Sequence, residues 1–335
     1  ALLARGHQVT AMQLRAGGRP VARVPLATGG TGQSPYPFLL AVSQDQTEAV
    51  VREALAARGI AVEWNTRLTA LMPAATGTEV TVTLTRNALE AHTRYAYVVG
   101  CDGAHSAVRH AVEIEFPGDA YAATFFVADT ELEGGLDPTA LHVSLHPNRF
   151  YGFFPLVGGR TRIIGLLPPG IDPATATLAD VQPDLEARKT LRIRRAGWFA
   201  TYRVHHRVAT QFRRGAVLLA GNAGHIHSPA GGQGMNTKMG DAVNLGWKLA
   251  AALRGTAPDA PALLATYEAE RRPFAEWLVG STDRAFTLAT TTNPGVAWLR
   301  RFAGWCCPWH YACPPWPAAR SGRCRRLALP TPIRP

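Results

Sequence analysis

Long hydrophobic runs and a secretory leader are both missing from this sequence of 335 residues. A membrane-spanning helix needs about 18 consecutive apolar residues, and no run approaches that length. The N-terminus also lacks the basic start and apolar stretch of a signal peptide. Because 47% of the residues are hydrophobic and 18% are charged, the composition is that of a folded protein with a large core. We therefore expect a cytoplasmic protein with no membrane partner.

Cysteine is scarce in most of the chain. Only Cys101 lies before residue 303, so the sequence offers no disulfide framework. Few cysteines suit a reducing cytoplasm, where disulfides do not persist. We interpret Cys101 as a small buried side chain rather than as a nucleophile.

Lysine is also scarce, although the net charge is +11. Eight arginines and no acidic residue lie between Arg284 and the C-terminus, so the first 283 residues carry a net charge of only +3. The three lysines, Lys189, Lys238 and Lys248, are scattered. A surface that follows nucleic-acid phosphates needs clustered basic residues. We therefore expect no nucleic-acid partner.

Residues 303–335 contain no acidic residue and no helical or strand periodicity. This composition is that of an irregular or non-native tail. The segment holds four cysteines and a histidine, namely Cys306, Cys307, His310, Cys313 and Cys324. They lack the paired Cys-x-x-Cys spacing of structural zinc sites, so we predict no metal site.

Alternating strand and helix patterns fill the first part of the chain. Two extended runs that flank a glycine turn predict a hairpin over residues 9–26. Residues 38–42 predict a buried strand, and the capping-box spacing of Asp45 and Glu48 predicts a helix that stops at Gly59. Further strands are predicted at Ala61–Trp64, Leu68–Met72, Glu79–Thr85 and Tyr95–Gly100. The last of them leads into a helix predicted from Ser106.

The middle of the chain changes to a different pattern. Residues 122–165 are rich in large apolar side chains and glycine turns, which is typical of an antiparallel sheet with one buried face. Another extended run covers residues 198–208. A short apolar strand at residues 216–220 and two helices, over 235–253 and from 261 past 277, complete the prediction.

Two glycine-rich loops carry most of the chemical information. The first, GCDGAHSAVR at residues 100–109, follows a predicted strand. The second runs from AGNAGHIHS at residues 220–228 into PAGGQGMN at residues 229–236 and opens a helix. Glycine lets a flat ligand approach the backbone, and a helix N-terminus favours negative charge. The second loop is therefore suited to an anion or to a ring that gains negative charge.

These two loops, about 110 residues apart, resemble the motifs of the aromatic-ring hydroxylase family. This family, the class A FAD-dependent flavoprotein monooxygenases, includes phenol, para-hydroxybenzoate and polyketide hydroxylases. The resemblance implies an α/β protein with the FAD/NAD(P)-binding three-layer fold of the para-hydroxybenzoate hydroxylase type and an antiparallel-sheet substrate subdomain. It implies four parts: a FAD-binding part truncated at its N-terminus, a substrate subdomain, a FAD-binding return with C-terminal helices, and the tail. Their bounds are 1–120, 121–210, 211–302 and 303–335.

The resemblance also implies site residues. Those for the FAD pyrophosphate and the passing nicotinamide are Asp102, Gly103, Ser106 and Arg109. Gly221 and Asn222 correspond to the residues that bind the ribityl chain of FAD, and Gln44 to one that reaches the FAD linker. The flavin-facing loop comprises Pro229, Gly231, Gly232, Gln233 and Gly234, and backbone amides at the pyrimidine edge come from Gly234, Met235 and Asn236.

Several of these residues also have a purely structural interpretation. Arg109 is as suited to bracing the core as to contacting a ligand, and Gln44 is a plain loop residue in the simpler interpretation. His225 and His227 suggest a metal or acid-base site, but packing or hydrogen bonding explains two histidines in such a loop more simply.

The sequence departs from the family pattern at three places. Asn222 stands where the family has Asp, so we expect FAD binding to be weaker by about 1 kcal/mol. Gly224 replaces the usual Ala of the family, and Lys238-Met239-Gly240 departs from the stretch of small residues common there. The βαβ unit with a Gly-x-Gly-x-x-Gly loop, which holds the ADP half of FAD in the family, is missing from the chain.

The expected activity follows from the resemblance. It implies a monooxygenase that uses FAD, NAD(P)H and O₂ to hydroxylate an aromatic or polyketide-like substrate through a flavin C4a-hydroperoxide. The alternative is a truncated, catalytically inactive FAD-binding remnant.

Overall fold

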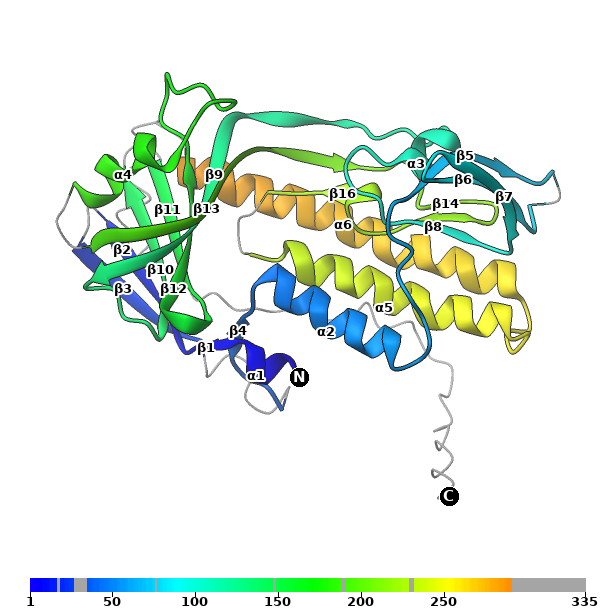
Figure 1. Cartoon of the computed structure of the whole chain (residues 1–335), viewed down its shortest axis with the longest axis horizontal. Helices are drawn as coiled ribbons and strands as arrows, with labels where there is room; N and C mark the ends of the chain where they lie inside the picture. Colours follow the sequence, from blue (N-terminus) through cyan, green and yellow to red (C-terminus); the bar gives the residue numbers. More distant parts are fainter. Residues whose placement is uncertain are drawn as a thin grey trace.

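The computed structural model describes residues 1–16, 19–26, 35–75, 77–146, 149–187, 191–228 and 232–290. Two β-rich regions lie at opposite ends of an elongated molecule (Figure 1). Long strands and a long helix connect these ends, so the two regions share one framework. The tail predicted over residues 303–335, with its cysteines and His310, lies outside the described residues.

The larger sheet has eight strands in the order β16-β13-β9-β12-β11-β10-β2-β3. Its strands are antiparallel except for the parallel pair β10 and β2. The bounds are β2 Ala11–Ala16, β3 Arg19–Pro25, β9 Gly118–Gly134, β10 Ala140–His146, β11 Arg149–Pro155, β12 Arg160–Leu166, β13 Leu191–Val208 and β16 His225–Ile226. The predicted hairpin and the predicted antiparallel sheet are both confirmed.

Neighbouring residues on β9 place two apolar clusters on opposite faces of this sheet, because successive strand side chains alternate. Phe126 belongs to a cluster that helix α4 (Leu178–Glu186) covers with Val181 and Leu185. Phe125 belongs to a second cluster on the other face. Near this second cluster, the hydroxyl of Tyr121 donates to Asp283 of the long helix α6 at 2.6 Å.

The opposite end of the molecule holds two small sheets. One is a meander of β5 (Thr66–Pro73), β6 (Val80–Arg86) and β7 (Leu89–Tyr95). The other has the order β14-β15-β8, with bounds Arg213–Arg214, Val217–Leu219 and Val98–Gly100. Strands β15 and β8 are parallel, whereas β14 and β15 form a hairpin. This parallel pair is the part of the fold that positions the site.

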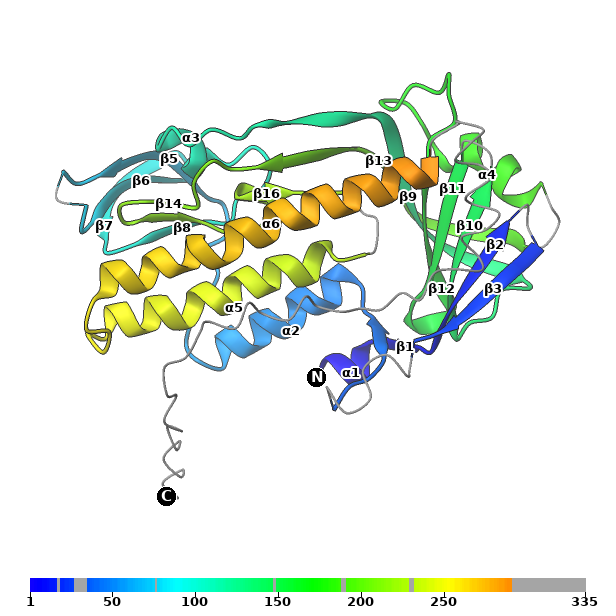
Figure 2. The same ribbon diagram turned by 180° about the vertical axis from the view of Figure 1, so that it is seen from behind.

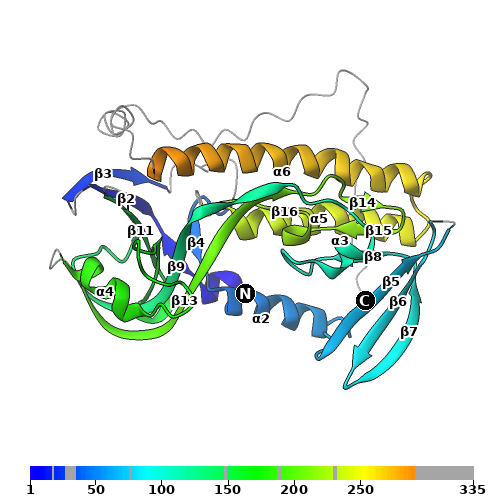
Figure 3. The same cartoon turned by 90° about the horizontal axis from the view of Figure 1, so that it is seen from above.

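Helices α5 (Gly234–Leu253) and α6 (Ala260–Thr290) pack side by side under the small parallel sheet (Figures 1 and 2). Figure 3 shows that α6 extends from this end of the molecule to the large sheet. The remaining elements are α1 Leu2–Arg5, β1 His7–Val9, β4 Leu39–Ala41, α2 Gln44–Ala56, α3 Ala107–Ala111 and the short 3₁₀ turns η1 Val157–Gly159 and η2 Gly221–Ala223.

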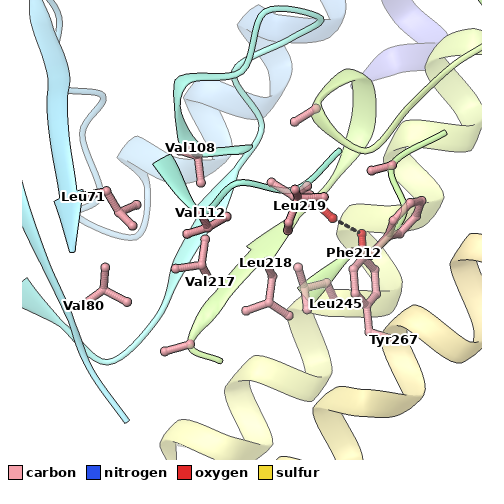
Figure 4. Close-up of a cluster of buried hydrophobic side chains, with 14 of the residues drawn as sticks. Leu71, Val80, Val108, Val112, Phe212, Val217, Leu218, Leu219, Leu245 and Tyr267 are labelled. Atoms are coloured by element: carbon pink, nitrogen blue, oxygen red, sulfur yellow. Dashed lines mark hydrogen bonds between the residues drawn. The ribbon is translucent and has the colours of Figure 1, made fainter. Parts of the chain in front are cut away.

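The core of this end lies between the parallel strands, α3, α5 and α6. All three residues of β15 are fully buried, which explains why the short apolar run at residues 216–220 was a clear strand signal. Figure 4 shows Tyr267 of α6 reaching across this core, where its hydroxyl donates to the carbonyl oxygen of Leu219 at 2.8 Å. This bond ties the end of β15 to the helix layer.

Four predictions about local structure are wrong. Residues 61–64 form no strand and are exposed. The segment at 38–42 is not buried: β4 pairs with the three-residue strand β1, and Leu39 is exposed. The N-cap of α2 is Ser43 rather than Asp45, and Cys101 is exposed rather than buried.

Candidate functional site

The two glycine-rich loops meet at one edge of the small sheet. Strand β8 ends at Gly100, and β15 ends beside it at Leu219, in parallel register. The amide of Ala220 donates to the carbonyl oxygen of Gly100 at 2.9 Å. Ligands of parallel α/β sheets bind at the carboxyl ends of the strands, where neighbouring loops separate. The chain therefore brings its two most distinctive loops to the place where such a fold binds ligands.

Asp102 organises the first loop through hydrogen bonds within it. Its carboxylate accepts from the Ser106 hydroxyl at 2.5 Å and from the amide of Val108 at 3.1 Å. The Ser106 oxygen in turn accepts from the amide of Arg109 at 2.9 Å, as an N-cap of α3. Between Asp102 and α3, Gly103 has a φ of +88°, and no atom lies within 4 Å of the position a Cβ would take. The loop therefore presents bare backbone to open space.

Arg109 joins the first loop to the second. Its guanidinium donates to the carbonyl oxygens of Ala223, at 3.0 Å, and Ala104, at 2.9 Å, and it lies over the ring of Phe116. The side chain is only 2% exposed, and burial lowers the pKa of Arg109 against the opposing charge of Asp102. Of the two interpretations given by the sequence, the observed contacts are those of a brace.

A buried carboxylate supports the second loop from below. Asp241 of α5 accepts from the amide of Gly221 at 3.1 Å, from His225 Nε2 at 2.8 Å and from Arg271 Nε at 2.7 Å. Burial acts to raise the pKa of Asp241, but the hydrogen bonds and charges of His225 and Arg271 outweigh it, and the pKa lies below its usual value. The turn at Gly221, with a φ of +64°, is thus held by a charge network.

The side of the second loop that carries Asn222 and the start of α5 is open by comparison. Asn222 is exposed, and no described residue makes a hydrogen bond to its side chain. No side chain caps the N-terminus of α5, so the amides of its first turn, at Gly234, Met235 and Asn236, have no partner from a capping side chain. Gly232 has a φ of +65° and open space where a Cβ would lie. Gln233 is the N-cap residue of the helix.

The remaining predicted residues are placed differently. Gln44 is the first residue of α2, and its amide donates to Glu48 at 2.9 Å. Pro229 and Gly231 lie outside the described residues. His225 and His227 are buried, stack on each other with ring centroids 6.4 Å apart, and make hydrogen bonds to Asp241 and to the Ser228 carbonyl. The interpretation of both histidines as packing and hydrogen-bonding residues agrees with these contacts.

Two important residues were missed by sequence reasoning. Asp241 and Arg271 support the Gly221 turn, although neither lies in either loop. A signal for Asp241 was available, because an acidic residue one helical turn beyond Thr237, at a position facing the core, needs a buried partner. For Arg271, on another helix, the sequence contains no comparable signal.

Other kinds of site find little support in the described part of the chain. No group of three or more His, Cys, Asp and Glu side chains there is placed to hold a metal ion. None of its helices combines the length and apolar composition needed to cross a membrane. A surface pocket of about 460 Å³ is lined by residues of β14 and α6, including Arg213 and Glu268, and by none of the glycine-loop residues.

Comparison with known proteins identifies the family of the chain. Residues 4–282 match the model of a family described as FAD binding domain. The chain is 35% identical over 298 residues to a 6-methylpretetramide 4-monooxygenase of Streptomyces rimosus, an alignment that covers 88% of this chain and 52% of the relative. The chain thus spans about half the length of this curated relative.

Solved structures share the fold. A p-nitrophenol 4-monooxygenase of Pseudomonas putida superposes with a TM-score of 0.79 at 24% identity, over 90% of this chain and 77% of that chain. An anhydrotetracycline hydroxylase of Streptomyces rimosus superposes with a TM-score of 0.69 at 32% identity, over 89% of this chain and 59% of the other. The sequence match and the shared fold agree with the family that the two loop motifs resemble. The chain belongs to the FAD binding domain family, with the α/β fold of the FAD-dependent aromatic-ring hydroxylases.

Proposed function

We propose that this chain forms the flavin and substrate site of a FAD-dependent monooxygenase that hydroxylates an aromatic or polyketide-like compound. In the overall reaction the substrate, NAD(P)H, a proton and O₂ give the hydroxylated product, NAD(P)⁺ and water. The observation that carries the proposal is the meeting of the two glycine loops beside the uncapped N-terminus of α5. The matched family and the monooxygenase relatives support it.

The residues present fit the flavin in three respects. Gly103 and Gly232 leave open space where a side chain would block a flat ring. The Asn222 side chain is exposed and able to accept a hydrogen bond from a ribityl hydroxyl. The first-turn amides of α5 and the positive end of its dipole suit the pyrimidine edge of the ring. Bound FAD supplies electron transfer from NAD(P)H and the activation of O₂.

In this proposal the protein's residues fall into two groups. Gly103, Asn222, Gly232, Gln233, Gly234, Met235 and Asn236 contact FAD. Asp102, Ser106 and Arg109 act through the loops, because their side chains make hydrogen bonds within the protein. Gln44 reaches FAD only if it leaves Glu48. We also propose the division into a FAD-binding part, a substrate subdomain over 121–210 and a FAD-binding return over 211–302.

The substrate is proposed to lie against the face of the large sheet opposite α4. This face carries an apolar cluster in which Phe125 and Tyr202 stack with ring centroids 5.6 Å apart. Burial raises the pKa of Tyr202 to about 12, so its hydroxyl stays protonated at neutral pH. No described residue makes a hydrogen bond to that hydroxyl, which leaves it able to donate to a substrate oxygen. A polycyclic, oxygen-bearing aromatic suits such a face, and 6-methylpretetramide is the compound named for one relative.

The test begins with the visible absorption spectrum of the purified 335-residue chain after incubation with FAD and desalting. We expect retained flavin, then NAD(P)H oxidation and a product heavier by one oxygen atom when polycyclic phenols are supplied. A folded chain that retains flavin but hydroxylates none of a panel of simple phenols and tetracycline-type polyketides would contradict the proposed activity. A folded chain that retains no flavin would support the inactive alternative instead.

A further inference from the structure

Lys238 lies between the two ends of the proposed flavin site. Its side-chain stem packs against the Gly221 turn: a Cβ built on Gly221 would lie 3.6 Å from Cβ and Cγ of Lys238. At the other end of the side chain, Nζ lies 3.6 Å from the position that a Cβ on Gly234 would take. The side chain therefore runs from the turn proposed to bind the ribityl chain to the first residue of α5.

Within the part of the chain that the structure describes, the ammonium group of Lys238 makes no ion pair. No described residue accepts a hydrogen bond from Nζ, whereas Nζ of Lys248, further along the same helix, bonds Glu270 at 2.8 Å. The nearby carboxylate of Asp241 already accepts three hydrogen bonds, from Gly221, His225 and Arg271. A lone ammonium beside these groups favours a ligand that brings its own negative charge.

The local field adds to this positive potential. The N-terminus of a helix carries a partial positive charge of about half an elementary charge, so a lysine beside the first residue of α5 is repelled by it. Burial lowers the pKa of Lys238, and the charge of Asp241 only partly opposes this effect. An anionic group that binds next to Nζ offsets both costs.

We propose that the Lys238 ammonium contacts the pyrimidine edge of the flavin ring and stabilises the negative charge that this edge gains on reduction. This inference rests on the function proposed above. The position of Nζ favours a contact with the pyrimidine edge rather than with the pyrophosphate. Nζ is the end of the side chain that lies beside Gly234, whereas Cβ and Cγ lie beside Gly221. Lys238 then sets how strongly the site prefers reduced over oxidised flavin.

The first experiment uses the low lysine content of the chain. Lys189, Lys238 and Lys248 are its three lysines, so amine acetylation followed by peptide mass spectrometry reads each of them separately. Lys248 is fully buried and bonded to Glu270, so it serves as the unreactive reference. The α-amine of the exposed Ala1 serves as the reactive reference. We expect saturating FAD or riboflavin to slow acetylation of Lys238 at least fivefold, and ADP to leave it unchanged.

The second experiment measures the reduction potential of the bound flavin in the full chain. We expect Lys238→Met to weaken the binding of reduced flavin about tenfold relative to the binding of oxidised flavin. For a two-electron couple this change equals a potential lower by about 30 mV. Lys238→Arg keeps the charge and should retain most of the wild-type potential. Arg94→Met, which removes an exposed positive charge on β7, should leave the potential unchanged.

Each outcome distinguishes the inference from the proposed function. Flavin binding without protection of Lys238, or with an unchanged potential in Lys238→Met, would overturn the inference and leave the proposed function intact. Protection by ADP but not by riboflavin would also overturn it, and would assign Lys238 to the pyrophosphate. If the folded chain binds neither FAD nor riboflavin, both the proposed function and the inference fail for this chain.

Discussion

Arg109 Nη1 donates to the carbonyl oxygen of Ala223 at 3.0 Å, a bond that joins the two glycine loops across 114 positions of sequence. The same guanidinium bonds Ala104 in the first loop. This buried side chain therefore helps to fix the relative position of the loops, in addition to the bond from Ala220 to Gly100 at the strand ends. Its role is comparable to that of a cross-link, although the bonds are hydrogen bonds.

Replacing this brace is expected to cost stability before it affects any ligand. Arg109→Ala removes two charge-assisted hydrogen bonds, leaves two carbonyl groups without their donor and empties the space over Phe116. We expect a loss of about 2–4 kcal/mol in the free energy of unfolding, measured by urea denaturation. Arg94→Ala, at an exposed site, is the control and should stay within about 0.5 kcal/mol of wild type. A loss of that small size for Arg109→Ala would show that the loops do not depend on the brace.

Asp241 is expected to make the stability of the chain depend on pH. Its pKa is lower in the folded chain than the usual 3.8, so the folded state binds fewer protons than the unfolded state between these two values. The carboxylate therefore contributes its full stability above pH 3.8, and this contribution is lost as the pH falls through the folded-state pKa. In Asp241→Asn the contribution is absent at every pH, and the buried charge of Arg271 loses its partner.

We expect Asp241→Asn to lower the free energy of unfolding at pH 7 by about 3 kcal/mol or more, and by about 1 kcal/mol less than that at pH 3, where the carboxylate has lost only part of its contribution. Urea unfolding of both chains between pH 3 and pH 7 measures the difference. Asp119→Asn is the matched control, because Asp119 is exposed and its side chain makes no hydrogen bond to any described residue. An equal loss for Asp241→Asn at pH 3 and pH 7 would mean that the carboxylate charge does not stabilise the turn.

The sequence predicts the elements best where apolar residues are dense. Strand β15 and helix α5 lie within one residue of their predicted bounds, because each buries a compact apolar set. Strand β7 was missed, since most of its residues are exposed and no alternating pattern marks it. The strand predicted at 61–64 is wrong because its apolar residues, including Trp64, suggested a buried strand although they are exposed in the structure.

The candidate site shows the same division between local and long-range information. The loops themselves were visible as sequence motifs, and the capping role of Ser106 follows from its place before a helix. The bond from Arg109 to Ala223 and the network of Asp241, His225 and Arg271 join residues from separate elements. Such contacts depend on how the elements pack against each other, and local patterns in a single sequence do not reveal this packing.

Restoring an acid at position 222 is expected to tighten flavin binding. An exposed carboxylate accepts a hydrogen bond from a ribityl hydroxyl more strongly than the amide of Asn222 does. For Asn222→Asp we expect the dissociation constant for FAD to fall about fivefold, corresponding to about 1 kcal/mol. Quenching of flavin fluorescence measures it. The control is Asn87→Asp, at the positive-φ turn between β6 and β7, which should leave FAD binding unchanged. Weaker binding in Asn222→Asp would place this side chain away from the ribityl chain.

Gly103 and Gly170 allow backbone strain to be separated from ligand contact. Both have a φ of +88°, and at both a Cβ would meet no atom within 4 Å. Replacing either by alanine therefore imposes a similar strain, about 1 kcal/mol or somewhat more, on the free energy of unfolding. Only at Gly103 does the new methyl group project from the loop proposed to face the cofactor. We expect both variants to show the same modest loss in urea denaturation, but only Gly103→Ala to lower the affinity for FAD, by tenfold or more. Equal FAD affinity in the two variants would mean that the first loop does not approach the flavin, and the assignment of Gly103 to the site would then be wrong.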